Sequence, residues 1–272
     1  MDVEYAIYPF DTMRITQRHD EGNHLAHWYP FKGCSDKPWD EACEDGGRSY
    51  FVPKNEYLVV EKIKNNNGCN NIILMSNELL KIPYQEQPTY LYLSLTHMNN
   101  DDYNKISVGQ ILHKGERIIR EGTSGQASGN HFHVTVGLPE YYGQKVNGNG
   151  KWCFVCDKAL EPNQAFYVDD SVDIIDNRKY DFSPVPSFFP PKGYFGLGDN
   201  DYNIGRISDF MVENFLGYGY KTGCKPEDVK GTYYGNNLKA WITRFQINNA
   251  LEADGNFGSP DLEKLKEYGF KE

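Results

Sequence analysis

The stretch Gly122–Gly137, GTSGQASGNHFHVTVG, joins a loop of small residues to an apolar, β-branched run. The composition of this run predicts a β-strand, and two histidines, His131 and His133, stand at its start. Because side chains at positions i and i+2 of a strand lie on one face, both imidazoles are expected to point the same way. The pair predicts two metal ligands, or one ligand beside an acid–base group. Two half-buried, hydrogen-bonded histidines are the alternative.

Similar short runs separated by Gly and Asn clusters predict further strands before residue 182, namely YLVVEKI (57–63), NIILMS (71–76) and YLYLSLTH (90–97). After residue 193 the apolar residues recur at helical intervals, as in Ile207, Phe210, Met211 and Phe215, in Leu238, Trp241, Ile242 and Phe245, and in SPDLEKLKEYG (259–269). The proline-rich FSPVPSFFPPKG (182–193) is expected to be extended and irregular. The sequence therefore predicts an α+β protein with a β-rich domain (1–181), a linker (182–193) and a small helical domain (194–272).

Composition restricts the partners. A formal net charge of -10 over 272 residues argues against a nucleic-acid or anionic-membrane surface. The N-terminus, MDVEYAIYPFDTMRITQ, lacks the basic region and apolar core of a secretory signal, and no apolar run is long enough to span a bilayer. We expect a soluble protein that starts in the cytoplasm. The cysteines are too few and scattered for a disulfide scaffold and are expected to be mostly reduced: Cys34, Cys43, Cys69, Cys153, Cys156 and Cys224.

Further histidines and carboxylates stand in separate segments. In the run 91–97 the leucines at every second position share one face with His97, which is expected to continue this buried row and emerge at the strand end. The segment NHLAHWYPFKGCSDKPWDEA (23–42) adds His24, His27, Asp36 and Asp40. Three protein ligands with a fourth position open for water are what a catalytic zinc requires. These residues therefore predict a candidate metal site.

The order of these features resembles the lysostaphin-like (LytM-type) zinc peptidases of the bacterial cell wall. In that family a strand ending in His is followed by a VGQ…KKG turn, a Gly-rich loop and an HxH strand. The elements here read YLYLSLTH, ISVGQILHKGERI, EGTSGQASG and HFHV, in the same order. The resemblance covers roughly Met13 to Val136. It implies an antiparallel β-sheet domain that binds Zn²⁺ and hydrolyses peptide bonds.

Carried over by position, the resemblance implies that His133 is a zinc ligand. It also implies that His131 and His97 act on the water and on the tetrahedral intermediate, without saying which of them takes which role. A short CFVC motif (153–156) has the spacing of a metal knuckle, but because no second cysteine pair accompanies it, no structural zinc is predicted there. The acidic pair Asp101–Asp102 is interpreted as a solvated turn.

The remaining ligands of the family come from an upstream His-x-x-x-Asp pattern. This pattern fails here, because Trp28 stands four positions after His24. A longer version pairs His24 with Asp40 in KPWDEA (37–42), which resembles a subset of phage endolysins where YPxDEA, followed by GGR, carries the aspartate. GGRSYFVP (46–53) follows here. His27 in place of His24, and Asp36 in place of Asp40, stay open.

The tail GNNLKAWITRFQINNALEADGNFGSPDLEKLKEYGF (235–270) resembles a three-helix peptidoglycan-binding module with an FQ…LxxDGxxGxxTxxxL signature. Ser259-Pro260-Asp261 replaces the usual Thr region, and the matching positions are Phe245, Gln246, Leu251, Asp254, Gly255, Gly258 and Leu265. Most of these residues are expected to form core and turn, because DGN and FGSP are typical of a turn that starts a helix.

Together the two resemblances imply a phage or prophage lysin whose partner is bacterial peptidoglycan. Its zinc endopeptidase domain is expected to cut peptide stems or cross-bridges while its tail holds the wall. It is expected to stay in the host cytoplasm until release, or to be carried in the virion, without binding nucleic acid or inserting into a membrane. The alternative is a non-catalytic wall-binding or virion structural protein with a degenerate peptidase fold.

Overall fold

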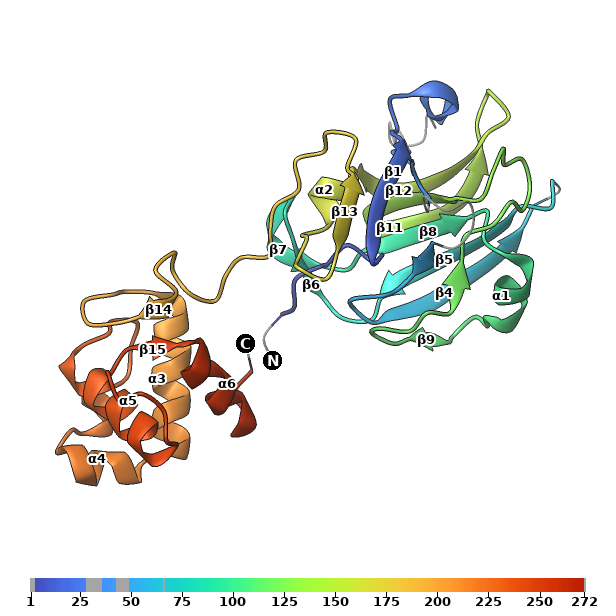
Figure 1. Ribbon diagram of the computed structural model, residues 1–272. Helices are drawn as coiled ribbons and strands as arrows, with labels where there is room; N and C mark the ends of the chain where they lie inside the picture. The colour runs from blue at the N-terminus through green and yellow to red at the C-terminus, as the bar shows by residue number, and fades with distance from the viewer. Residues whose placement is uncertain (1–2, 28–35, 43–48, 66, 272) are drawn as a thin grey trace. The chain divides into compact units, whose positions relative to one another are not determined.

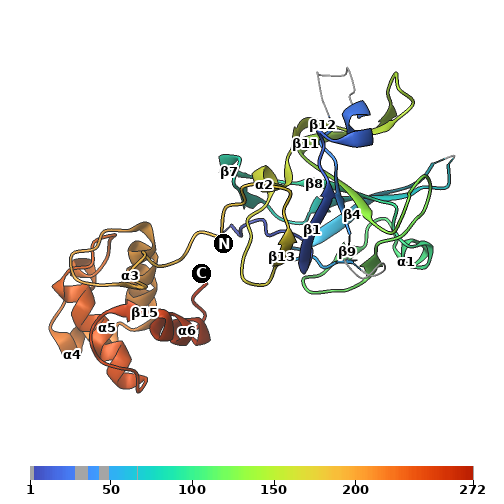
Figure 2. The same ribbon diagram turned by 45° about the horizontal axis from the view of Figure 1, so that its top comes forward.

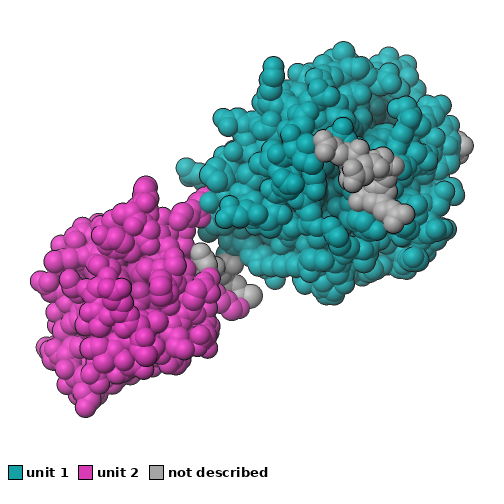
Figure 3. All heavy atoms as spheres, viewed as in Figure 1, with its two compact units in different colours: residues 1, 3–185 teal, residues 2, 186–272 magenta. Residues whose placement is uncertain are grey.

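The computed structural model describes residues 3–27, 36–42, 49–65 and 67–271. The chain divides into two compact units, 3–185 and 186–272, which are coloured separately in Figure 3. The division falls inside the proline-rich segment. Phe182 packs against the apolar core of the first unit, whereas Phe188 is buried in the core of the second. Both ends of the predicted linker therefore belong to a packed unit.

A large sheet forms the first unit (Figure 1). Within the described residues its strands follow the order β13-β1-β2-β11-β8-β5-β4-β9, and β12 pairs with β11. Their bounds are β1 Thr12–Gln17, β2 Trp39–Glu41, β4 Tyr57–Lys64, β5 Asn70–Ser76, β8 Tyr92–Thr96, β9 Ile111–Leu112, β11 Phe132–Val146, β12 Trp152–Leu160 and β13 Asp173–Asp176. The pairings are antiparallel except for β1 with β13. The expected α+β class and antiparallel sheet are confirmed.

Alternation along the central strands separates a core from a polar face. Phe132 and Val134 of β11 and Leu93 and Leu95 of β8 are fully buried in the core. Each such side chain stabilises the fold by roughly 1.5–3 kcal/mol through its burial. The intervening residues lie on the opposite face because the side-chain period of a strand is two. They are polar and line a cleft: Asn71, Ser94, Thr96, His133 and Thr135.

Strand β11 is longer than the predicted run. The expectation stopped at Gly137, but the strand continues to Val146 and pairs with β12. Its register shifts between Leu138 and Tyr141, where Pro139 stands. A bulge tolerates proline because the missing N–H is not needed for the ladder there. The long hairpin that results carries Cys153 on its second strand.

Short elements surround the sheet in both views (Figures 1 and 2). Their bounds are η1 Gly22–Ala26, β3 Tyr50–Phe51, β6 Leu80–Ile82, β7 Gln85–Thr89, α1 Asn100–Lys105, β10 Ile119–Arg120 and α2 Pro162–Ala165. The interpretation of Asp101–Asp102 as a solvated turn is wrong for Asp102, which is 5% exposed. Its carboxylate accepts hydrogen bonds from the backbone N–H of Arg120 at 3.0 Å and from its Nε at 2.7 Å. This contact ties α1 to β10.

The second unit is mainly helical. Its elements are β14 Tyr194–Phe195, α3 Tyr202–Asn214, α4 Gly217–Thr222, η3 Pro226–Asp228, α5 Asn236–Asn248, β15 Phe257–Gly258 and α6 Ser259–Glu267. Helices α3, α5 and α6 lie where the apolar spacing predicts them. The short α4, with the sequence GYGYKT, has no such spacing and no buried residue, and was not expected. None of the helices in the described residues has the length and apolar character needed to cross a bilayer.

The FQ…DG segment of this unit forms a clamped turn. Gln246, at 2% exposure, donates from Nε2 to Asp254 Oδ1 at 3.1 Å and to the carbonyl of Asn256 at 2.7 Å. Its Oε1 accepts the N–H of Gly255 at 2.9 Å. Gly255 has φ +72°, and a Cβ there would lie 2.6 Å from Thr243 Oγ1. The motif thus fixes the turn that precedes α6.

Candidate metal centre and cleft

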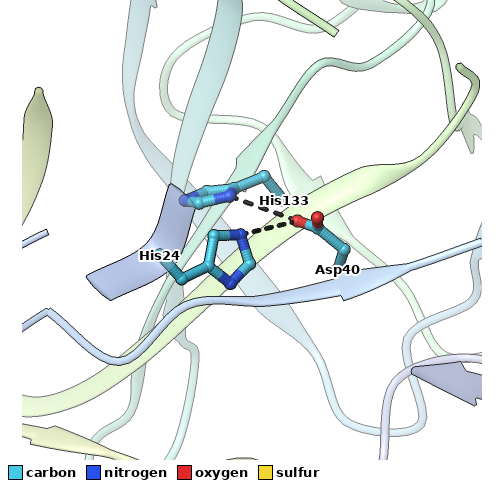
Figure 4. A group of neighbouring side chains, drawn as sticks. All are labelled: His24, Asp40 and His133. Carbon is cyan, nitrogen blue, oxygen red and sulfur yellow. Dashed lines mark ion pairs between the residues drawn. The ribbon is translucent and has the colours of Figure 1, made fainter. Parts of the chain in front are cut away.

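Three side chains from distant segments converge at one end of the cleft: His24 of η1, Asp40 of β2 and His133 of β11 (Figure 4). His24 Nε2 lies 3.1 Å from Asp40 Oδ1, and His133 Nδ1 lies 3.3 Å from the same oxygen. The sheet brings two of them together directly, because Asp40 and His133 are partners in the β2–β11 pairing.

The orientation of His24 leaves one nitrogen turned toward the carboxylate. Its Nδ1 lies 2.9 Å from the carbonyl oxygen of Arg18. Since a carbonyl only accepts, a neutral His24 carries its proton on Nδ1 and presents the Nε2 lone pair to Asp40. Asp40 Oδ1 is buried and makes no hydrogen bond. A lone pair and an anionic oxygen at this distance repel each other unless a cation lies between them.

The spacing fits a tetrahedral zinc. With Zn–N and Zn–O distances near 2.1 Å, neighbouring ligand atoms of a tetrahedron lie about 3.4 Å apart. The two measured separations to Asp40 Oδ1, 3.1 and 3.3 Å, are close to this value. The donor set of two imidazoles and one carboxylate leaves a fourth position for water or substrate. The Arg18 carbonyl would fix the His24 ring as an outer-shell partner.

Burial sets the protonation of this group. Burial alone would raise the pKa of Asp40, but the imidazoles of His133 and His24 outweigh it and hold the pKa well below its usual range. Burial lowers the pKa of His133 to about 3, against a smaller opposing effect of Asp40. At neutral pH Asp40 is therefore anionic and His133 neutral, which are the states that bind a metal.

His97 and His131 lie beside the three convergent side chains. Their ring centroids are 4.8 Å apart, and His131 Nε2 lies 3.8 Å from Asp40 Oδ1. The Nδ1 atoms face backbone carbonyls, that of Ser124 at 2.7 Å for His97 and that of Gly129 at 2.9 Å for His131. Both rings therefore keep Nε2 available to exchange a proton.

The prediction that His97 lies on the same face of the strand as the buried leucines is wrong. Strand β8 ends at Thr96, and His97 has a left-handed backbone with φ +66°. This conformation breaks the alternation, so the ring joins Ser94 and Thr96 in lining the cleft instead of continuing the buried leucine row. Burial lowers the pKa of His97 despite the hydrogen bond to Ser124. The alternation of the leucines could not reveal this turn of the backbone.

Gly122 holds the two segments that carry these histidines. Its carbonyl accepts the N–H of His131 at 3.2 Å. A Cβ at this position would lie 2.7 Å from the backbone N of Asn99 and 2.8 Å from the carbonyl oxygen of His97. No real Cβ tolerates such distances, so only glycine permits this close approach. Gly122, the first residue of the Gly-rich loop, is therefore needed for the close packing of two backbone segments.

The open alternatives, His27 and Asp36, lie together at a neighbouring position. His27 Nδ1 is 3.6 Å from Asp36 Oδ2, and Cys153 of β12 completes a group whose candidate ligand atoms all lie within 4.8 Å. The combination joins residues far apart in sequence and was not anticipated. Cys34 and Cys43, which were expected to be reduced thiols, and the GGR motif at 46–48 lie outside the described residues.

A cleft of about 210 Å³ runs over the polar face of the sheet. Uncharged amide and hydroxyl groups from the strands form its floor. Asn71 Nδ2 donates to Ser94 Oγ at 2.9 Å and to Thr96 Oγ1 at 2.8 Å. Gln144 Nε2 donates to Ser94 Oγ at 3.3 Å. The same cleft is lined by His24, His27, Asp36, Asp40, His97, His131 and His133.

Comparison with known proteins gives structural neighbours only. No protein-family model and no curated protein matches the sequence. Similar solved structures, at low identity and partial coverage, are M23/LytM-family peptidases. A zinc-containing peptidase from Vibrio cholerae is 18% identical with a TM-score of 0.31, and the match covers 50% of this chain and 36% of that one. The chain thus spans about a third of that relative.

Two further structures match over most of their own length. LytU is 18% identical with a TM-score of 0.32, and the match covers 52% of this chain and 81% of that one. The catalytic domain of a variant of the prophage-encoded M23 protein EnpA from Enterococcus faecalis is 16% identical, with a TM-score of 0.31. That match covers 59% of this chain and 95% of that domain.

Proposed function

We propose that the protein is a zinc-dependent endopeptidase that hydrolyses peptide bonds in the stems or cross-bridges of peptidoglycan. The observation that carries this proposal is the approach of His24 Nε2 and His133 Nδ1 to Asp40 Oδ1 without a hydrogen bond. Such convergence of buried donor atoms is typical of a metal site. The proposed ligands are His24, Asp40 and His133.

A zinc ion bound there supplies a Lewis acid that polarises the scissile carbonyl and lowers the pKa of water. The chain's own residues do the remaining work. His97 and His131 are the proposed proton carriers, since each keeps Nε2 free on the cleft side. One accepts the proton of the attacking water and passes it to the leaving amine, while the other, when protonated on both nitrogens, donates from Nε2 to the developing oxyanion.

The cleft favours an extended peptide as substrate. Its floor offers donors and acceptors from Asn71, Ser94, Thr96 and Gln144. These neutral groups suit the N–H and C=O groups of a peptide backbone, which need partners when they leave water. Without a charged side chain among these four, recognition at this floor depends on hydrogen bonds to the backbone.

The second unit is the proposed wall-binding module, and the whole chain a phage or prophage lysin. Its support is the FQ…LxxDGxxG motif, whose Gln246 and Gly255 shape the turn before α6. A groove borders this turn and is lined by Tyr194, Leu251, Glu252, Asn256 and Ser259, among others. Tethering by this unit would raise the local concentration of the peptidase at the wall.

Mass spectrometry of digested peptidoglycan tests the proposal. Purified wall is incubated with the protein, with and without a zinc chelator, and with the variants His133→Ala and His113→Ala. His113 is a matched control, because its side chain is 58% exposed and pairs with Glu56 away from the cleft. We expect new free amines and peptide fragments that depend on zinc and on His133 but not on His113.

Two outcomes contradict the proposal. New reducing sugar ends without new amines would identify a glycosidase. Intact wall carrying bound protein, in a chain that retains no zinc, would identify a non-catalytic wall-binding protein.

A further inference from the structure

A second cluster of metal-binding side chains lies next to the proposed catalytic zinc. His27 directly follows η1, Asp36 precedes β2, and Cys153 lies on β12. Their candidate ligand atoms all lie within 4.8 Å of one another. The ring of His27 is 5.0 Å from that of His133, centroid to centroid, so the two clusters are neighbours.

Two buried polar atoms of this cluster, one on Asp36 and one on His27, make no hydrogen bond. The Asp36 side chain is 2% exposed, and its Oδ1 makes no hydrogen bond. Oδ2 accepts the N–H of Phe154 at 3.0 Å. His27 Nδ1 is also buried without a hydrogen bond, although it lies 3.6 Å from Asp36 Oδ2. Leaving buried polar atoms unsatisfied destabilises the fold, and an ion between them would remove this cost.

The chemistry of the cluster suits zinc. Thiolate, imidazole and carboxylate are the three ligand types that Zn²⁺ takes in proteins. The separation of 3.6 Å between His27 Nδ1 and Asp36 Oδ2 is close to the ligand spacing of about 3.4 Å expected in a zinc tetrahedron. The Phe154 N–H donates to this same oxygen, Asp36 Oδ2, and so orients the carboxylate in the way that outer-shell partners do in known sites.

The two cysteines of the CFVC motif do not act together as ligands in this cluster. Cys153 and Cys156 are three residues apart on a strand and so point to opposite faces. Cys156 packs into an apolar cluster with Phe154 and Ile73. Of these two cysteines, Cys153 is the one grouped with His27 and Asp36.

We propose that His27, Asp36 and Cys153 form a second zinc site. His27 and Asp36 also line the cleft, which gives the ion a path of entry and leaves a fourth position for water. The ion would link the end of η1 and the start of β2 to β12. Since η1 carries His24 and β2 carries Asp40, this link holds two ligands of the first site in place. The inference stands whether or not the protein is a peptidase.

Cobalt substitution of the full-length chain tests the site with a signal that activity does not supply. Metal is removed by chelation and Co²⁺ is added in steps, while near-ultraviolet absorption is recorded. A thiolate bound to Co²⁺ gives an intense charge-transfer band, whereas a site of two imidazoles and a carboxylate gives none. We expect this band, together with two zinc ions per chain by elemental analysis of the zinc-loaded protein.

Cysteine variants assign the band to one sulfur. Cys153→Ser is expected to abolish it and to remove one of the two zinc ions. Cys69→Ser controls for a thiol that lines the cleft, and Cys224→Ser for a thiol of the second unit. Both controls are expected to keep the band. His133→Ala is expected to lose the other zinc ion but to keep the charge-transfer band.

Several results overturn the proposal. One is a single zinc ion per wild-type chain, and another is a cobalt spectrum without the band. A band that survives Cys153→Ser or disappears in Cys69→Ser would also assign the sulfur elsewhere. If Cys153→Ser does not fold, Asp36→Asn supplies the same comparison, and loss of one zinc ion with a weakened band is expected.

Discussion

At the scale of residues, the candidate site depends on which nitrogen of each imidazole is already engaged. Backbone carbonyls of Arg18, Ser124 and Gly129 face the Nδ1 atoms of His24, His97 and His131. Each carbonyl selects the tautomer that leaves Nε2 directed at the cleft. His133 is the exception, since its Nδ1 is the atom directed at Asp40. The surrounding groups thus decide, before any ion binds, which nitrogen each of the four histidines directs at the cleft: Nε2 for His24, His97 and His131, and Nδ1 for His133.

Gly122→Ala is expected to lower the rate of wall hydrolysis by about tenfold to a hundredfold while zinc content stays unchanged. The added methyl group collides with the turn of His97 and Asn99 and displaces the His97 ring, the proposed proton carrier, by a fraction of an ångström or more. Kinetics on purified peptidoglycan, with elemental analysis of zinc, measure both quantities. Gly129→Ala is the matched control, because a Cβ there meets nothing within 4 Å. Equal rates for both variants would contradict this role.

The sequence indicated the residues of the candidate site better than their arrangement. The HxH pair and Asp40 stand in readable motifs, and the strand period places both histidines on one face. The left-handed backbone of His97 has no such signal, because histidine is not a residue that demands a positive φ. The grouping of Cys153 with His27 and Asp36 depends on the register of β12, which no local pattern specifies.

At the scale of elements, β11 is the strand that organises the site. It pairs with β2 and β8 at the cleft end and with β12 beyond. The part of β11 that the sequence predicted is the run up to Gly137, where side chains alternate clearly between the two faces. The continuation past Gly137 was not predictable from propensity, because Gly and Pro normally end a strand and only the bulge at Pro139 accommodates them.

Asp102→Asn tests the contact that fixes α1 to β10. Burial would raise the pKa of Asp102, but its hydrogen bonds and charge contact with Arg120 hold it below the ordinary value. An acid with a lowered folded pKa stabilises the fold above its unfolded pKa, near 3.9, and that contribution is lost as pH falls through the folded pKa. The variant is expected to be less stable by about 1–2 kcal/mol at pH 7.

The difference in stability between wild type and Asp102→Asn is expected to narrow as pH falls below about 4. Urea unfolding at several pH values measures it. Asp101→Asn is the control, since that neighbouring side chain is exposed. A difference that stays constant down to acid pH would show that the ion pair does not contribute.

Gln246→Ala is expected to destabilise the second unit by about 1–3 kcal/mol and to leave zinc content unchanged. The amide satisfies three polar groups of the turn before α6, and its removal leaves the buried N–H of Gly255 without this acceptor. Thermal unfolding measures the loss, with Asn248→Ala on the exposed face of α5 as control. Equal stability of the two variants would contradict the clamp.

At the scale of the whole molecule, each unit has its own apolar core. The first core is built from the sheet and includes Trp39 and Phe132, and the second surrounds Trp241 and Phe245. The change from strand to helical spacing is visible in the sequence, whereas the small strand pair β14–β15 and helix α4 depend on packing that spacing does not encode.

A chain that ends at Val185 is expected to keep its zinc and to lose retention on the wall by about a hundredfold. The first unit has a complete core, and the ligands lie within it, so metal binding does not need the second unit. The contact with the wall that we propose for the second unit is lost with the truncation. Sedimentation with purified peptidoglycan and elemental analysis measure the two effects. Unchanged sedimentation would assign wall binding to the first unit.

The left-handed backbone of His97 also bears on how this protein can evolve. A positive φ costs a non-glycine residue about 1–3 kcal/mol, whereas glycine and asparagine adopt it more readily. Selection for heat resistance alone would therefore favour glycine or asparagine at position 97. Such survivors would tolerate higher temperatures and lack the imidazole that the proposed chemistry requires. At position 97, higher stability and the proposed activity therefore favour different residues.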